Sequence, residues 1–148
     1  MCIRDRCSCI ALRVRELPDD VYAEITRLSR EGDEAAVAGR FDDAIVKYES
    51  AYALVPESKW DWDASTWILI AIADAHFHAG RFVECSAPLQ EVMHCPDAIG
   101  NPFVHLRRGQ VFYELGDKES AADELARAFL SEGRGMFRGT IRSISLFS

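Results

Sequence analysis

Apolar residues recur through the middle of the chain at intervals of three and four positions, which is the spacing of one face of an α-helix. Ile68, Ile72, Ala75 and Ala79 form one such row, and Gly80 follows it directly. Glycine adopts positive φ without strain, so it is a common residue just after the end of a helix. The pattern therefore predicts helices separated by tight glycine turns.

This pattern occurs three times in the chain. The turn glycines are Gly39, Gly80 and Gly116, and each has a small residue seven positions before it. A second amphipathic helix follows each turn, and its small residues allow the two helices of a pair to approach closely. We therefore expect an all-α fold of about three antiparallel helix hairpins over residues 20–132. Buried small residues in these contacts should include Ala44, Ala51, Ala121 and Ala128.

Two prolines bear on where the helices begin. Asn101 and Pro102 suit the start of the fifth helix, because asparagine caps a helix and proline fits its first position. Pro88 falls inside the expected fourth helix, where it would kink the helix unless the helix begins near Ser86. The sequence is compatible with either alternative at Pro88.

Both ends of the chain differ in character from its middle. Residues 1–6 resemble the in-frame translation of a transposase adapter used in sequencing libraries, so we expect a non-native leader outside the fold. Residues 138–148 hold no acid and show no helical period, which indicates either a frayed terminus or a frameshift or truncation after Phe137. We expect one domain over residues 7–137.

Composition excludes several classes of function. A chain of 148 residues with 49% apolar and 28% charged residues has the composition of a single globular domain. Its net charge of −7 argues against wholesale binding to nucleic acid or to an anionic membrane. The longest uncharged stretch, residues 64–73, is too short to span a bilayer. Without a signal peptide or a CxxC pair, free thiols in the cytoplasm are expected.

The three repeats resemble the tetratricopeptide repeat (TPR), a helix–turn–helix unit of about 34 residues. The expected repeats cover residues 25–58, 65–98 and 102–135. The first repeat carries the family's small, aromatic and proline positions at Gly32, Gly39, Phe41, Ala44, Tyr48, Ala51 and Pro56. Segments such as Trp60-Asp61-Trp62 and Met93-His94-Cys95-Pro96 further resemble a small group of single-domain bacterial TPR proteins. The resemblance implies a right-handed solenoid that binds another protein.

The resemblance also implies a binding groove on the concave face, formed by the first helix of each hairpin. The carried-over positions that we take as the candidate site are Asp33, Trp67, Ile70, Asp74, Phe77, His78, Phe103, Leu106, Gln110, Tyr113 and Glu114. These positions are aromatic, apolar or acidic, and none is lysine or arginine. The lysines and asparagines with which chaperone-binding TPR domains hold a carboxylate are absent. The ligand should therefore be basic or apolar, unless a C-terminal helix of the family covers the groove.

Three other chemistries compete with this interpretation. His76, His78, His94 and Cys95 are zinc-ligand types, but His76 and His78 are two apart on a helix and point away from each other. Cys95 beside His94 could be a thiol nucleophile, although no third group is available to orient them. Trp60, Asp61, Trp62 and Asp63 could form a sugar site, but helix capping and hydrophobic anchoring explain them better.

The sequence thus favours a non-catalytic protein-interaction module without a cofactor, whose partner is another protein. Stacked helix hairpins present an extended surface rather than a deep pocket, which suits this function. One alternative is a structural or assembly subunit that self-associates through its terminal repeats. The other is a small metal-dependent or thiol enzyme.

Overall fold

The computed structural model describes residues 17–132. Within this range the chain is all-helical and has no strand, as the sequence predicts. The elements are α2 (Asp19–Val37), α3 (Phe41–Ala53), the short 3₁₀ helix η1 (Lys59–Asp61), α4 (Asp63–His78), α5 (Phe82–Val92), α6 (Pro102–Glu114) and α7 (Lys118–Glu132). The expected leader, residues 1–6, and the doubtful tail, residues 138–148, lie outside the described residues.

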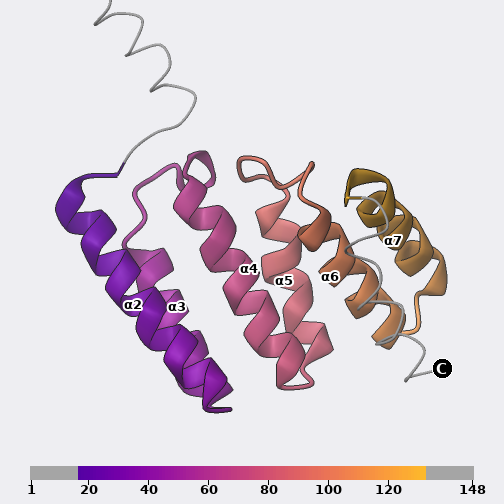
Figure 1. Ribbon diagram of the computed structural model, residues 1–148, viewed down its shortest axis with the longest axis horizontal. Coiled ribbons are helices and arrows are strands. Elements are labelled where there is room, and N and C mark those ends of the chain that lie inside the picture. Colours follow the sequence, from indigo (N-terminus) through magenta and orange to yellow (C-terminus); the bar gives the residue numbers. More distant parts are fainter. Residues whose placement is uncertain (1–16, 133–148) are drawn as a thin grey trace, which may run out of the picture.

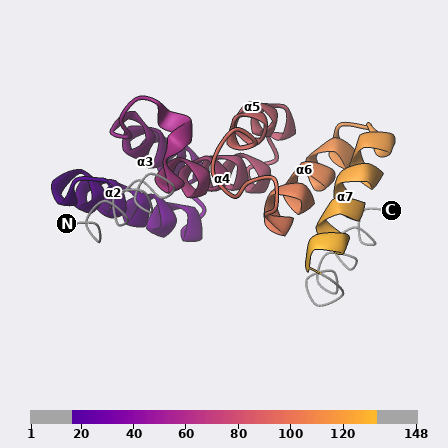
Figure 2. The same ribbon diagram turned by 90° about the horizontal axis from the view of Figure 1, so that it is seen from above.

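Consecutive helices pack in pairs, α2 with α3, α4 with α5 and α6 with α7. The pairs stand side by side in one row that follows the order of the chain (Figure 1). Seen from above, α3 and α5 lie on one side of the row that α2, α4 and α6 form (Figure 2). The first helices of the three pairs are therefore neighbours on the same side of the molecule.

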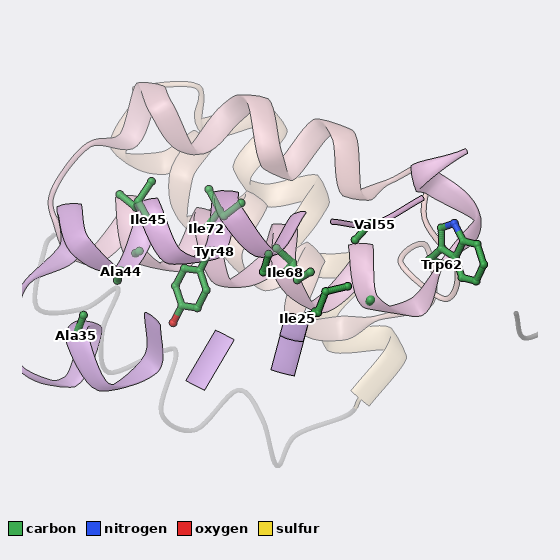
Figure 3. Close-up of a cluster of buried hydrophobic side chains, with 12 residues drawn as sticks. Ile25, Ala35, Ala44, Ile45, Tyr48, Val55, Trp62, Ile68 and Ile72 are labelled. Atoms are coloured by element: carbon green, nitrogen blue, oxygen red, sulfur yellow. The ribbon is translucent and has the colours of Figure 1, made fainter. Parts of the chain in front are cut away.

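The largest group of buried apolar side chains joins the first pair to α4. Ile25 of α2, Ala44 and Tyr48 of α3, and Ile68 and Ile72 of α4 belong to it (Figure 3). The burial predicted for the repeat alanines is confirmed, because Ala44, Ala51, Ala121 and Ala128 are at most 2% exposed. These alanines leave space in which the larger neighbouring side chains interdigitate.

Close packing between the two helices of a pair requires a small residue in the first helix. A Cβ atom placed on Gly32 would lie 2.6 Å from the Tyr48 ring, and one on Gly109 would lie 2.7 Å from Leu125 Cγ. In the second pair the corresponding contact is polar, since the Cys85 thiol lies 3.3 Å from the Ala73 carbonyl oxygen. In each pair, the backbone of the first helix thus makes one close contact with a side chain of the second helix.

The turn glycines and the helix starts follow the local chemistry. Gly39, Gly80 and Gly116 have φ of 79°, 77° and 89°, which confirms the predicted left-handed turns. The Asn101 side chain accepts a hydrogen bond from the Phe103 N–H at 2.9 Å, so Asn101 is the predicted cap of α6. α5 begins at Phe82 rather than near Ser86, and Pro88 is buried inside it. Burial of the Pro88 ring offsets the loss of one helical hydrogen bond.

A buried polar group fastens the last pair of helices. His105 of α6 is 3% exposed; its Nδ1 lies 2.6 Å from Glu124 Oε2 of α7, and its Nε2 lies 2.6 Å from the Ile99 carbonyl oxygen. Arg108 Nε approaches Glu124 Oε1 at 3.2 Å. The group ties α6, α7 and the loop before α6 together.

The close packing at Ala44 predicts a penalty for a larger side chain. Ala44→Leu should lower the free energy of unfolding by about 1–3 kcal/mol, because added methyl groups overpack a filled interior. Urea denaturation followed by circular dichroism measures this change. Ala53→Leu, at an exposed position of the same helix, is the control and should change stability by no more than about 0.5 kcal/mol. Equal stability of the two variants would contradict the assigned helix register.

The polar group around His105 predicts a second stability effect. Glu124→Gln keeps the size of the side chain but removes the charge that faces His105 and Arg108, so unfolding should become easier by about 1–3 kcal/mol. Asp123→Asn is the matched control, since its carboxylate pairs with Arg127 on the exposed face of α7 and contributes at most about 1 kcal/mol. If thermal melts of the two variants coincide, the His105 group does not stabilise this helix pair.

Candidate functional site

A groove of about 490 Å³ lies along the first helices, between α2, α4 and the start of α6. Its walls are mainly apolar and aromatic, with a few polar groups. The residues that line it are Asp33, Ala36, Val37, Phe41, Tyr48, Trp67, Ile70, Ala71, Asp74, Ala75, His78 and Phe103. We refer to this hollow as the groove. A concave site of this size that combines an apolar floor with few polar groups is typical of ligand binding.

The structure brings together only part of the candidate site. Six of its residues line the groove, namely Asp33, Trp67, Ile70, Asp74, His78 and Phe103. The others do not: Leu106 is buried, Phe77 packs edge-on against Phe82, and Gln110, Tyr113 and Glu114 follow farther along α6. The sequence interpretation missed Phe41 and Tyr48, which it assigned to the repeat core as aromatic positions. Both lie on α3 but reach into the groove between the first helices.

Asp33 and Tyr48 form the polar corner of the groove at α2. The Tyr48 hydroxyl donates a hydrogen bond to Asp33 Oδ1 at 2.6 Å. Burial of the ring, assisted by the neighbouring Asp33 carboxylate, raises the pKa of Tyr48 above its usual value. The hydroxyl therefore stays protonated and holds the carboxylate in place. No cation among residues 17–132 forms an ion pair with Asp33, which is exposed to solvent.

Asp74 lies in the middle of the groove wall and is already paired. Arg107 of α6 donates a hydrogen bond to its Oδ1, and His78 Nε2 lies 3.3 Å from its Oδ2. Among the described residues, no lysine or arginine lines the groove itself, but Arg107 beside it neutralises one of its acids. The repeat alignment does not reveal this arginine, because it places position 107 outside the groove. In the structure the Arg107 side chain reaches across to Asp74 on α4. Asp74 and Arg107 belong to different helix pairs, so only their packing brings them together.

Arg107 is held on several sides at the α6 end of the groove. Its guanidinium carbon lies 4.2 Å from the centre of the Phe77 ring and 5.2 Å from that of Phe103. Its Nη1 donates to Gln110 Oε1 at 2.9 Å, and its side chain is 11% exposed. Burial lowers the pKa of Arg107, while the charge of Asp74 acts in the opposite direction. Stacking on two rings and pairing with a carboxylate make this an ordered cation.

Trp67 is the exposed aromatic side chain of α4 that lines the groove. Its side chain is 38% exposed, and Val37 at the end of α2 is 91% exposed. His78 stacks on Phe41 with ring centres 6.3 Å apart. Asp33, Val37, Trp67 and His78 are the exposed residues of the lining.

The candidate residues for metal, thiol and sugar chemistry are engaged in contacts of other kinds. Within residues 17–132, no group of three or more metal-ligating His, Cys, Asp or Glu side chains converges. His94 stacks on Trp60 at 4.5 Å between ring centres, and Trp62 is buried with its indole N–H donating to the Pro56 carbonyl oxygen at 3.0 Å. Burial raises the pKa of the Cys95 thiol to about 11, so it is protonated at neutral pH. A protonated thiol is a poor nucleophile.

Comparison with known proteins adds no identity. The chain matches no protein-family model and no curated protein. Among the helices of the described range, none combines the length and the apolar character needed to cross a membrane.

His76 provides a pH-dependent test of the packing behind the groove. Its Nδ1 is buried without a hydrogen-bond partner in the described part of the chain, and burial lowers the pKa of its imidazole. The His76 imidazole of the unfolded chain therefore takes up a proton near pH 6.5, whereas that of the folded chain takes one up only at lower pH. Stability should fall as the pH drops below about 6.5, by at most about 1.4 kcal/mol per pH unit from this group.

Urea denaturation of the protein and of His76→Gln, between pH 7.5 and pH 5.5, measures this contribution. The variant should lose less stability on acidification than the unmodified protein. His94→Gln, which removes an exposed imidazole, is the control and should keep the full pH dependence. An identical pH dependence in all three proteins would show that His76 is readily protonated in the folded state.

Proposed function

We propose that the chain is a TPR-like right-handed solenoid of three antiparallel helix hairpins that acts as a non-catalytic protein-interaction module in the cytoplasm. Its groove takes a basic or apolar peptide or helix of another protein. The alternation of first and second helices, the turn glycines and the small residues at the close contacts support the fold assignment. The free, buried thiols of Cys85 and Cys95 are consistent with a reducing compartment.

The observation that carries the proposed function is the lining of the groove. It combines an exposed tryptophan, Trp67, with an exposed aspartate, Asp33, that has no cationic partner among the described residues. Aromatic side chains dominate the energy of many interfaces, and acidic groups beside them select the charge of the partner. The groove thus offers one apolar anchor and one negative charge, which together suit a basic or apolar segment.

The engagement of the other reactive groups in separate contacts supports a non-catalytic role. Catalysis needs a nucleophile or base within hydrogen-bond reach of an orienting group. His94 and Cys95 engage separate partners, and the groove carboxylates are held by Tyr48 and Arg107. Side chains that are engaged with one another in this way favour a binding role over a catalytic one.

A second candidate function is self-association through the ends of the row. Tyr22 of α2 is 54% exposed and Leu130 of α7 is 82% exposed, so apolar side chains stand on both terminal helices. Exposed apolar residues on terminal repeats favour end-to-end contacts. Sedimentation velocity over a range of concentrations separates this function from groove binding, since only self-association raises the mass with concentration.

The proposed function predicts that Trp67 is the main anchor of a bound peptide. Fluorescein-labelled nonapeptides of alanine and leucine with one arginine should bind, and the same peptides with glutamate in its place should not. Trp67→Ala should weaken binding by about 2 kcal/mol, a roughly 30-fold loss. Fluorescence anisotropy measures the affinities.

Trp60→Ala is the matched control, because Trp60 is also exposed but stacks on His94 outside the groove. It should leave the affinity unchanged. Equal losses for the two tryptophan variants, or equal binding of the arginine and glutamate peptides, would contradict recognition in the groove.

A further inference from the structure

We propose that Arg107, which neutralises the groove residue Asp74, restricts the ligand to a single cationic side chain placed at Asp33. This inference rests on the proposed function and deepens it, since it specifies the ligand chemistry. The partner segment carries one lysine or arginine, and its other contacting side chains are apolar. A segment with two adjacent cations is disfavoured.

The first step concerns Asp74, the groove carboxylate that is already paired with a cation of the protein itself. The Arg107 guanidinium lies over the Phe77 and Phe103 rings, donates to Asp74 and is capped by Gln110. A ligand arginine would use the same kinds of contact: two aromatic faces, a carboxylate and an amide oxygen. The protein fills this place with its own side chain, so Asp74 has little negative charge left to offer.

The second step concerns the α2 end, which is arranged differently. Asp33 accepts a hydrogen bond from Tyr48 and pairs with no cation among residues 17–132. Ala36 and Val37 on the same helix, and Trp67 on α4, line the same groove and present apolar surface. The stem of a lysine or arginine can lie along such a surface while its charged end meets the carboxylate. Charge complementarity therefore places the ligand cation at Asp33.

The third step is the interaction between the two ends. Both aspartates line the same groove, so a second ligand cation aimed at Asp74 would meet the like charge of Arg107. Like charges at an interface exclude wrong partners more strongly than matching charges attract right ones. Arg107 thus acts as a selectivity residue, because it leaves only one of the two aspartates, Asp33, able to pair with a cation of the ligand.

The test compares two labelled nonapeptides of alanine and leucine, one with a single arginine and one with two arginines, the second placed at each spacing in turn. The unmodified protein should bind the single-arginine peptide at least as well as any two-arginine peptide. Arg107→Gln and Arg107→Met free Asp74, and each should bind the best two-arginine peptide about fivefold more tightly than the unmodified protein does. Arg107→Met also keeps apolar contact with both rings, should Arg107→Gln fold poorly.

Arg127→Gln is the charge-matched control, because Arg127 lies on α7, none of whose residues line the groove. It changes the net charge equally and should leave the preference for one arginine intact. Asp33→Asn should weaken binding of the single-arginine peptide. If all peptides fail to bind, the proposed function itself fails. If the single-arginine peptide binds but neither Arg107 variant gains affinity for two arginines, or Arg127→Gln gains equally, only the role of Arg107 is wrong.

Discussion

The close approach of two helices at one small residue is the constraint on which the rest of the structure depends. At Gly32 and Gly109 there is no room for a Cβ atom, because the Tyr48 ring and the Leu125 side chain occupy that space. This contact determines how near the second helix of a pair lies to the first. The distance then sets how closely the next pair can stack, and so the width of the groove along α2, α4 and α6.

The groove combines this geometry with an uneven distribution of charge. Its two aspartates have different partners: Asp33 meets a neutral tyrosine hydroxyl, whereas Asp74 meets the guanidinium of Arg107. An acidic residue that is paired with a cation of the protein holds its neighbours in place. An acidic residue that has no such partner can pair with a cation of a ligand. The net charge of −7 therefore describes the groove poorly, because one arginine beside it changes the local balance.

Polar contacts orient the last helix pair relative to the second pair, where fewer apolar contacts join neighbouring pairs. α5 meets α6 less extensively than α3 meets α4, yet Arg107 bridges to Asp74 and Arg108 donates to the Leu89 carbonyl oxygen at 3.2 Å. His105 then connects α6 with α7 and with the preceding loop. Directional contacts of this kind specify orientation, whereas apolar burial supplies most of the stability.

The sequence by itself determined the helices, their turns and the buried alanines, because helical period, glycine and small residues act locally or within a neighbouring pair. It also identified much of the groove, including Asp33, Trp67 and Phe103, through the register of the first helices. Only the tertiary structure decided which of the aspartates is neutralised and that Leu106 is buried. The reach of Arg107 across two helix pairs depends on their separation and rotation, and residue spacing along one chain carries no information on either.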